Sequence, residues 1–304
     1  MPPKDVAKGQ AGGAGGNREG RKRTAEETVL ILQSGLYRNA KGEAVSFADD
    51  LARAISGSTL FSEAESAGLR AQPFKKTFDT PFMYVVNAGS LQAASRLVDL
   101  GCVDPLVLNF ASAKNPGGGF LNGSLAQEES LALCSGLYFC IKDSGMHAHN
   151  AAIKPNDGVY SHLMVYSPKV PVLRDDQTLE LLDSPFQVSF LTAPAVNAGH
   201  ARKHGYSESQ ILEIMEDRMG RVLAIAAAKG HRHLVLGAWG CGVFGNSPED
   251  IAALFRAALS GRFRGVFETI VFAVLSRNEK DGSHSTFSKG FPDAKTELPL
   301  IPRA

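Results

Sequence analysis

The chain has 304 residues, of which 44% are hydrophobic, and a formal net charge of +1 at pH 7. This length allows a large buried core, and the near-neutral charge argues against a protein that coats nucleic acid by charge alone. The four cysteines lie far apart without CxxC spacing, which favours reduced thiols over a disulfide framework. With no apolar run of membrane-spanning length and no secretory h-region, we expect a monomer of the cytoplasm or nucleus without membrane contact.

The two ends of the chain differ from its middle. Residues 1–24 are rich in glycine and in Lys/Arg, which predicts a disordered basic tail. The cluster Arg21, Lys22 and Arg23 is read either as a nuclear signal or as the solvated start of a helix. Residues 25–280 have the pattern of one globular domain, and residues 281–304 have no clear period, which predicts an irregular tail over the surface.

Between these ends, helical and strand-like segments alternate. Nearly continuous apolar strands between helices indicate an α/β layered domain with a buried sheet. Ser207 with Gln210 fits a capping box, and Ser247 followed by Pro248 fits the start of another helix. The expected strands are 83–88, 105–112, 162–167, 186–193, 233–239 and 269–275. The expected helices are 25–37, 47–55, 90–100, 127–141, 207–229 and 247–259.

A glycine-rich motif follows the strand 233–239. In "GAWGCGVFGNSPED" (237–250), Gly240, Gly242 and Gly245 match G-x-G-x-x-G between a strand and a helix. Such a turn is either a cradle for a pyrophosphate or a tight connection without a ligand. A dinucleotide-binding fold is the rival interpretation, but its fingerprint normally opens a domain, and here only one clear strand follows it.

A second glycine run lies in "NPGGGFLNGSLAQEES" (115–130), between the strand 105–112 and the helix 127–141. Strand ends are where α/β sheets place ligands, so two glycine-rich loops at two strand exits are expected to clasp one extended anionic ligand. Glu128 lies three residues before the apolar Leu131, which predicts that it points inward or along a cleft and not to bulk water. Adjacent helical side chains diverge by about 100°, so Glu128 and Glu129 are not expected to straddle a bond as ordinary glycosidase acids do.

A division of labour between the two glutamates is the more plausible chemistry. One carboxylate would act on the bond while the other holds a neighbouring hydroxyl. The helix N-terminus lowers the pKa of a glutamate, whereas burial and the adjacent carboxylate raise it, and a general acid needs the second effect to prevail. The alternative is that both are first-turn acids that only complement the helix dipole.

GGG followed closely by QEE resembles the signature of poly(ADP-ribose) glycohydrolases of the compact bacterial type. The resemblance extends over residues 20–280, through "AEETVLIL", "YSPKVPVLRDD", "TAPAVNAG" and "GAWGCGVFGN". It implies an α/β fold of the macrodomain type: a three-layer α/β/α sandwich with a mixed sheet of about six strands and an N-terminal helical extension. It also implies that residues 25–280 form the glycohydrolase domain, which releases ADP-ribose from poly(ADP-ribose), with other ADP-ribosylated macromolecules as alternative substrates.

The resemblance implies the following roles. Glu129 is the catalytic acid and base, Glu128 holds a ribose hydroxyl, and Gln127 supports the loop. The bond breaks toward an oxocarbenium ion that the nearby diphosphate stabilises, and the same carboxylate activates the attacking water, with no metal or cofactor. The compact type is associated with cleavage from chain ends. The residues expected to line the substrate are Gly117, Gly118, Gly119, Gly240, Cys241, Gly242, Val243, Phe244 and Gly245.

Three rival readings remain. A non-catalytic reader of ADP-ribose would share the fold, but it has no need of the vicinal acids. A magnesium-dependent ADP-ribosyl hydrolase would gather aspartates around the metal, but the only pairs, Asp49–Asp50 and Asp175–Asp176, fit solvated loop or helix acids better. A zinc site on "HAH" (147–149) or "HRH" (231–233) lacks cysteine partners at ligand spacing. Asn87 in "VVNAGS" resembles a strand motif of ordinary macrodomains and is a minor candidate for ligand contact.

Overall fold

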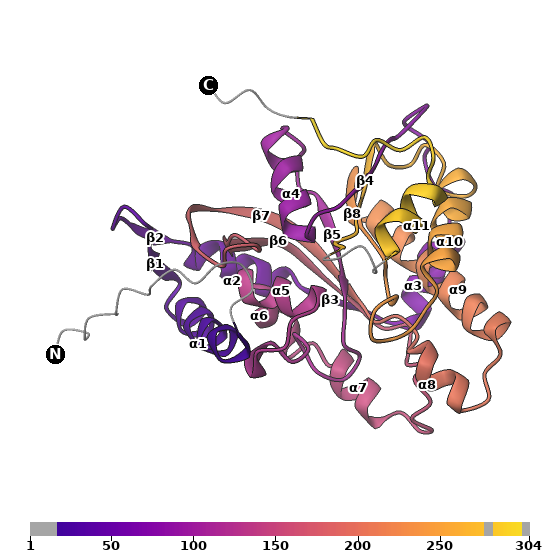
Figure 1. Ribbon diagram of the computed structural model, residues 1–304, viewed down its shortest axis with the longest axis horizontal. Helices are drawn as coiled ribbons and strands as arrows, with labels where there is room; N and C mark the ends of the chain where they lie inside the picture. Colours follow the sequence, from indigo (N-terminus) through magenta and orange to yellow (C-terminus); the bar gives the residue numbers. More distant parts are fainter. Residues whose placement is uncertain (1–16, 277–281, 300–304) are drawn as a thin grey trace.

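A seven-stranded mixed sheet forms the centre of the protein, in the order β3-β6-β7-β5-β8-β9-β4 (Figure 1). The structure is a computed structural model that describes residues 17–276 and 282–299. Strands β7, β5, β8, β9 and β4 run parallel to one another, whereas β6 is antiparallel to both β7 and β3. The strands are β3 (Thr59–Phe61), β4 (Phe82–Val86), β5 (Leu106–Phe110), β6 (Met164–Arg174), β7 (Leu181–Ala193), β8 (His233–Leu236) and β9 (Thr269–Ala273).

Helices cover both faces of the sheet, which confirms the predicted three-layer sandwich (Figure 1). One apolar core joins the sheet to α9, α10 and α11, and a second joins the other face to α4, α5 and α6. The helices are α1 (Arg18–Ser34), α2 (Ala48–Gly57), α3 (Glu63–Ala71), α4 (Ser90–Asp99), η1 (Phe120–Asn122), α5 (Gln127–Cys134), α6 (Leu137–Ile141), α7 (Met146–Ala152), α8 (Ala198–Lys203), α9 (Glu208–Ala228), α10 (Pro248–Ser260) and α11 (Ser283–Gly290).

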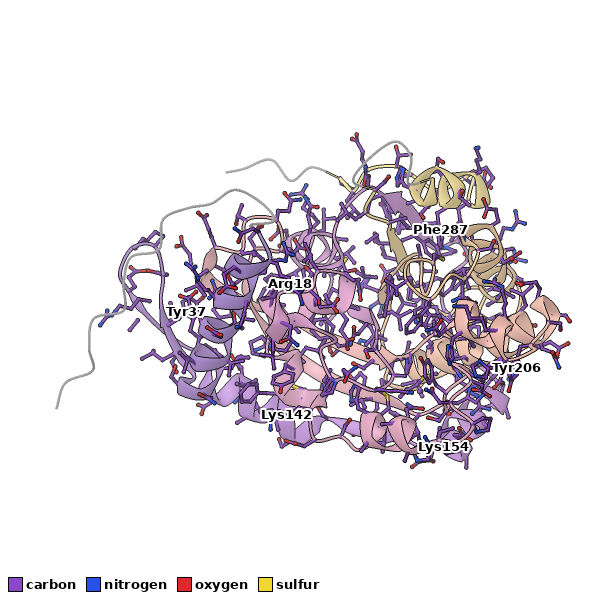
Figure 2. All side chains as sticks on the ribbon, turned by 60° about the horizontal axis from the view of Figure 1, so that its bottom comes forward. Arg18, Tyr37, Lys142, Lys154, Tyr206 and Phe287 are labelled. Atoms are coloured by element: carbon purple, nitrogen blue, oxygen red, sulfur yellow. The ribbon has the colours of Figure 1, made fainter. Side chains whose placement is uncertain are left out.

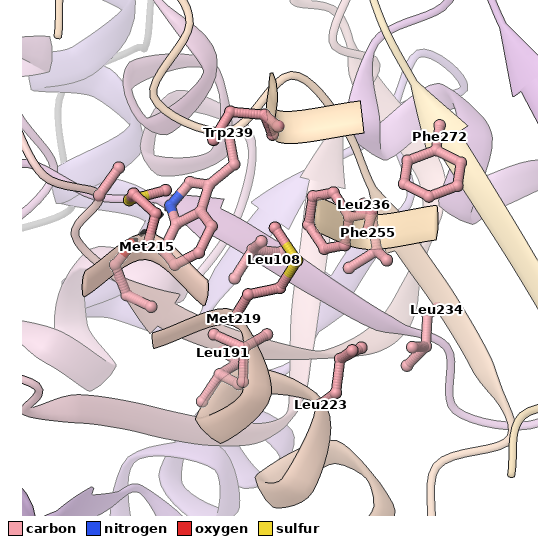
Figure 3. Close-up of a cluster of buried hydrophobic side chains, with 14 of the residues drawn as sticks. Leu108, Leu191, Met215, Met219, Leu223, Leu234, Leu236, Trp239, Phe255 and Phe272 are labelled. Atoms are coloured by element: carbon pink, nitrogen blue, oxygen red, sulfur yellow. Dashed lines mark hydrogen bonds between the residues drawn. The ribbon is translucent and has the colours of Figure 1, made fainter. Parts of the chain in front are cut away.

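Burial on both faces explains why the central strands are continuously apolar. In β5, Leu108 faces the core under α9 and Val107 faces the opposite core. Figure 3 shows Leu108 among the side chains of the first core, with Trp239 beside Met215. The indole N–H of Trp239 donates to the carbonyl of Ala193 at 3.0 Å, so this fully buried ring also satisfies its polar atom.

The N-terminal prediction is wrong for residues 18–24. These residues form the first turns of α1, with the side chain of Asn17 accepting from the N–H of Gly20 at 2.9 Å. The basic cluster is therefore the start of a helix, while residues 1–16 lie outside the described residues. The expected helix also ran too far, because Gly35 adopts φ +66° and ends α1, and the chain then forms the hairpin β1 (Leu36–Arg38) and β2 (Ala44–Ser46).

Two further boundaries differ from the sequence prediction. The sheet has a seventh strand, β3, whose three residues are too short to carry a recognisable alternation. The helix expected over 127–141 is interrupted at Ser135, which is extended and bridges Val172 of β6, while Gly136 donates its N–H to the carbonyl of Pro171 at 2.9 Å. The caps predicted at Ser207 and Ser247 are confirmed, since each side chain accepts a backbone N–H of its helix.

The prediction of an irregular tail beyond residue 280 is wrong for residues 283–290, while residues 291–299 have no helix or strand. Residues 283–290 form α11, and Phe287 and Phe291 are buried against Phe272 of β9, with ring centroids 5.6 Å and 4.4 Å from the ring of Phe272. Figure 2 labels Phe287 on this outer helix. A domain ending at residue 280 therefore leaves out part of its own core. None of the helices in the described ranges is long and apolar enough to cross a bilayer, and the four cysteines are free.

The burial of Phe287 gives a test of the role of α11. We expect Phe287→Ala to lower the free energy of unfolding by about 3 kcal/mol, because the ring is fully buried in the core. Phe82→Ala is the control, since Phe82 is 55% exposed on the edge strand β4 and should cost less than about 1 kcal/mol. Urea denaturation measures both values, and equal losses would contradict a structural role for α11.

Candidate active site

The two glycine-rich segments leave neighbouring strands at one edge of the sheet. The first glycine loop (111–126) follows β5, and the second glycine loop (237–247) follows β8. Strand β7 lies on the other side of β5, and residues 194–197 leave its end. Because these strands are parallel, their carboxyl ends meet at the same edge, where α/β proteins bind ligands.

Glu128 points into the protein, as its spacing from Leu131 predicts, and is only 3% exposed. Its Oε2 accepts the backbone N–H of Ser112 at 2.6 Å, and its Oε1 accepts from Nδ2 of Asn109 at 3.2 Å. Burial raises the pKa of Glu128 to about 8, and the adjacent Glu129 adds to this, although the hydrogen bonds oppose it. Burial thus prevails over the hydrogen bonds at Glu128, and the carboxyl is mostly protonated at pH 7.

Glu129 is fixed at both carboxylate oxygens by backbone groups. Oε1 accepts the N–H of Gly119 at 2.9 Å, and Oε2 accepts the N–H of Ala126 at 2.9 Å. One side chain therefore joins the first glycine loop to the start of α5. A carboxylate offers about four acceptor positions, so two remain for a ligand or a water.

The two carboxylates converge on Gly118. This residue adopts φ +61°, and a Cβ built on it would lie 2.3 Å from Oε1 of Glu129 and 3.3 Å from Oε2 of Glu128. Only glycine tolerates both the backbone conformation and this contact. The glycine run is thus required by the protein's own carboxylates as well as by any ligand that approaches it.

The amides of the glycine run are already used within the protein. The N–H of Gly118 donates to the carbonyl of Asn115 at 2.9 Å, and that of Gly119 donates to Glu129, while the N–H of Gly117 lowers the pKa of Glu128. The amides of Gly118 and Gly119 therefore have partners within the protein. The first glycine loop positions the two carboxylates.

Gln127 ties α5 to the end of β5. Its Oε1 accepts the N–H of Phe110 at 2.9 Å, and its Nε2 donates to the carbonyl of Leu108 at 2.8 Å. The paired residues of β5 and β8 end at Val107, so this side chain satisfies backbone groups beyond the ladder. Through these bonds Gln127 fixes the position of the first turn of α5, from which Glu128 and Glu129 project.

Helix α1 braces the first glycine loop from outside. Arg18 donates through Nε to the carbonyl of Asn122, and Arg21 donates through Nε to that of Gly123, both at 2.9 Å. A Cβ on Gly123 would lie 2.1 Å from the carbonyl oxygen of Arg18, so the helix and the loop are in close contact. Thr28 further along α1 donates to the carbonyl of Leu133 in α5 at 3.0 Å. The N-terminal helical extension therefore holds both the loop and the helix that carry the glutamates.

The base of the second glycine loop is held by Asn246, which is 5% exposed. Its Nδ2 donates to the carbonyl of Val196 at 2.8 Å and to that of Gly240 at 3.0 Å. Gly240 adopts φ +77°, and a Cβ there would lie 2.6 Å from both Ala195 and Asn246. This turn therefore depends on the segment that leaves β7.

The tip of the second glycine loop offers its backbone to the outside. The N–H groups of Gly242, Val243 and Phe244 have no hydrogen-bond partner within residues 17–276 and 282–299. Val243 is 92% exposed, and a Cβ on Gly242 would meet nothing within 4 Å. Consecutive unpaired amides are a suitable cradle for an anion. The carbonyl of Phe244 accepts the N–H of Gly199 at 3.0 Å, which fixes this residue from α8.

The two remaining residues expected in this loop have structural contacts. Gly245 adopts φ +69°, and its carbonyl accepts from Arg202 at 3.0 Å. Cys241 is half-buried, and its thiol donates to the carbonyl of Trp239 at 3.8 Å. Burial raises the pKa of Cys241 to about 12, so the thiol stays protonated and is not a nucleophile.

Sequence reasoning missed two residues beside the site, Asn109 and Tyr160. Asn109 is fully buried and joins Glu128 to Thr192 of β7, with Nδ2 3.2 Å from the side-chain oxygen of each. One polar residue inside the apolar run "PLVLNFAS" was the signal for it. Tyr160 adopts φ +60°, with its ring centroid 6.1 Å from that of Phe244 and 6.0 Å from the ammonium of Lys114.

The rival metal sites find no support in the contacts of their residues. Asp175 accepts two backbone N–H groups of its own turn, and Asp176 accepts the N–H of Gln92 in the first turn of α4. His147 is buried, and burial lowers its pKa to about 4. His231 lies between the carbonyl of Asp104 and the hydroxyl of Tyr166. Across the residues that the structure describes, no group of three or more His, Cys, Asp or Glu could hold a metal ion.

Asn87 is placed away from the glutamates. It follows β4, the edge strand, which β8 and β9 separate from β5. Its Oδ1 accepts the backbone N–H of Ser276 at 2.8 Å. Its contact is therefore with the segment after β9 and not with the first glycine loop.

Comparisons with known proteins point to one family. Residues 25–175 match the model of the microbial-type PARG catalytic domain. The structure of poly(ADP-ribose) glycohydrolase from Thermomonospora curvata is 40% identical, with a TM-score of 0.84 over 90% of this chain and 100% of that one. The enzyme from Deinococcus radiodurans in complex with ADP-ribose is 38% identical, with a TM-score of 0.73 over 80% and 96%. The search of curated proteins gave no match.

The raised pKa of Glu128 predicts a pH-dependent stability. Because its folded pKa of about 8 exceeds the ordinary value of 4.5, the contribution of Glu128 to stability is greatest below pH 4.5 and is lost as pH rises from 4.5 toward 8. We expect Glu128→Gln to abolish this loss. Between pH 4.5 and 8, its free energy of unfolding should therefore rise relative to that of the wild type by up to about 1.4 kcal/mol per pH unit. Urea denaturation at a series of pH values measures the difference.

Glu65→Gln is the control for this measurement. The hydrogen bonds from Ser62 lower the pKa of Glu65, so its stabilising effect is lost only as pH falls below about 4.5. A difference between wild type and Glu128→Gln that stays flat from pH 5 to 8 would show that burial does not keep this carboxyl protonated.

Proposed function

The chain belongs to the poly(ADP-ribose) glycohydrolase family, and from this we propose a role for the site at the carboxyl ends of β5 and β8. We propose that it hydrolyses the ribose–ribose O-glycosidic bond of poly(ADP-ribose) and releases ADP-ribose. The observation that carries the proposal is the convergence of Glu128 and Glu129 on Gly118. This places two carboxyl groups at the exit of β5, beside the exit of β8 with its unpaired amides. A glycosidase needs a proton donor at the bond and a fixed position for the substrate on either side of it.

We assign the substrate diphosphate to the second glycine loop. The amides of Gly242, Val243 and Phe244, which have no partner among the described residues, support this role, because backbone N–H groups bind phosphate oxygens without a cation. The first glycine loop would face the diphosphate and the distal ribose, since Gly117, Gly118 and Gly119 present no side chain. Phe244 would pack on that ribose, held by its carbonyl contact to Gly199.

We assign to Glu129 the role of proton donor to the leaving oxygen. Its two backbone hydrogen bonds fix the carboxylate and leave acceptor positions open, so the side chain can meet the leaving oxygen and later the attacking water. Proton donation assists departure of that oxygen, and the bond breaks toward an oxocarbenium ion that the negative diphosphate stabilises. Water attack then returns a proton to Glu129, which restores the enzyme.

Glu128 is assigned to hold a ribose hydroxyl of the leaving part. It is buried and mostly protonated at pH 7, so it can donate a hydrogen bond as well as accept one. Burial of Glu128 thus keeps a proton on that side chain, next to Glu129, at neutral pH. Asn109 and Ser112 keep the group in place.

The test of the proposed function is Glu129→Gln. We expect loss of hydrolysis by about 10²-fold or more, the range for removal of a general acid, while ADP-ribose still binds with nearly unchanged affinity. Release of ADP-ribose from defined-length polymer measures turnover, and titration calorimetry measures binding. Free ADP-ribose as the earliest product would support cleavage from chain ends, whereas internal fragments would contradict it.

Glu65→Gln is the matched control, because Glu65 holds the same third position of its helix and accepts the N–H of Ser62 there. It should retain full activity. Turnover of Glu129→Gln close to that of the wild type would reject the assignment. Binding of ADP-ribose by the wild type without any release from polymer would identify a reader instead of an enzyme.

The contact of Gly118 with Glu129 gives a second test. We expect Gly118→Ala to lower kcat by at least about 10²-fold, because the methyl group displaces the carboxylate that performs acid catalysis. Gly101→Ala is the control: Gly101 has φ +80°, but a Cβ there meets nothing within 4 Å. Both variants should lose about 1 kcal/mol of stability from the left-handed backbone. Gly118→Ala also loses stability through the contact with Glu129, so kcat is compared per folded protein. Equal kcat in the two variants would contradict the role of this contact.

A further inference from the structure

A cavity of about 470 Å³ lies at the edge of the sheet opposite the glycine loops. It is bounded by the end of α3, the extended segment 72–78, the end of α9 and the residues that precede β8 and β9. Its volume is within the range of pockets that hold small ligands. It lies at the amino ends of the parallel strands, so it is separate from the proposed active site. Its lining includes Phe74, Lys75, Thr77, Phe78, His231 and Arg232.

The surroundings of this cavity are strongly basic. The segments 70–79, 229–232 and 262–268 carry seven Lys and Arg against two Asp and Glu, whereas the whole chain has a net charge of only +1. A local positive excess of this kind attracts polyanions. Lys75 and Lys76 are exposed and have no ion pair or hydrogen bond with any of the residues that the structure describes. Their charges are therefore available to a ligand.

Aromatic rings and arginines lie together at the same cavity. The guanidinium of Arg232 is 5.1 Å from the ring centroid of Phe78, and that of Arg262 is 5.5 Å from that of Phe74. Arg232 also pairs with Glu268 at 2.5 Å, and Arg262 donates to the carbonyl of Gln72 at 2.9 Å, so both planes are held in position. Aromatic rings and fixed guanidinium planes are the surfaces on which nucleobases stack.

We propose that this cavity binds an adenine nucleotide unit of poly(ADP-ribose) remote from the bond that is being cleaved. Lys75 and Lys76 would meet the phosphates, and the planes around Phe74 and Phe78 would meet the base. The proposal rests on the proposed function, which supplies a polymer that is both anionic and rich in bases. A second point of attachment keeps the polymer near the active site after each cleavage, because the next binding event is then intramolecular.

The experiment reverses the charge at the cavity in the full-length protein. Lys75→Glu with Lys76→Glu, combined with Glu129→Gln to prevent cleavage, is compared with Glu129→Gln alone. We expect about a tenfold weaker affinity for labelled polymer of about 20 units and a smaller dependence of that affinity on salt. Affinity for ADP-ribose should stay within about twofold, because the active site is untouched. Fluorescence anisotropy measures both affinities.

The matched control is Arg38→Glu with Lys41→Glu, on the hairpin β1–β2, which changes the net charge equally. An equal loss of polymer affinity in the control, or no loss at the cavity, would overturn the proposal. It would also be overturned if the cavity variant lost as much affinity for single-stranded DNA of matched charge, since the site would then be one for nucleic acid. These outcomes are independent of the proposed function, which fails only if the wild type does not hydrolyse the polymer.

Discussion

The site depends on the start of α5 being fixed directly over the end of β5. Gln127 makes this junction with the backbone of Leu108 and Phe110, and Asn109 adds a side-chain contact to Glu128. Glu128 and Glu129 then diverge from the first turn of α5: Glu128 points into the core and Glu129 points toward the first glycine loop. If the junction moved by a residue, the buried carboxyl of Glu128 would lose its hydrogen bond from the amide of Ser112, at a cost of about 1–3 kcal/mol.

Much of the fold could be predicted because long apolar periods dominate it. The six longer strands, the cap of α9 at Ser207 and the inward direction of Glu128 all follow from local spacing. What failed depends on contacts distant in sequence. Strand β3 exists through its pairing with β6, the break at Ser135 through its bridge to β6, and the burial of Phe287 through the sheet. No local pattern carries such information.

The residues of the candidate site could be predicted better than the hydrogen bonds between them. The glycines and glutamates are found by motif, but which amide meets which carboxylate is set by backbone geometry. The sequence left open whether the helix dipole or burial controls the glutamates. At Glu128 burial controls the pKa, because only 3% of the residue is exposed to water that would stabilise the charge. Asn109 shows that a lone polar residue in an apolar strand is itself a useful signal.

The backbone amides of the two glycine loops differ in whether they already have a partner in the protein. In the first loop the amides of Ser112, Gly119 and Ala126 are used to hold the glutamates, so few remain for a ligand. In the second loop the tip at 242–244 keeps its amides unpaired within the described residues, while Asn246 holds the base. Separating the groups that fix the acid from those that can hold an anion lets each be rigid. An amide shared by a carboxylate and a phosphate would bring two negative groups together, and each would weaken the other's binding.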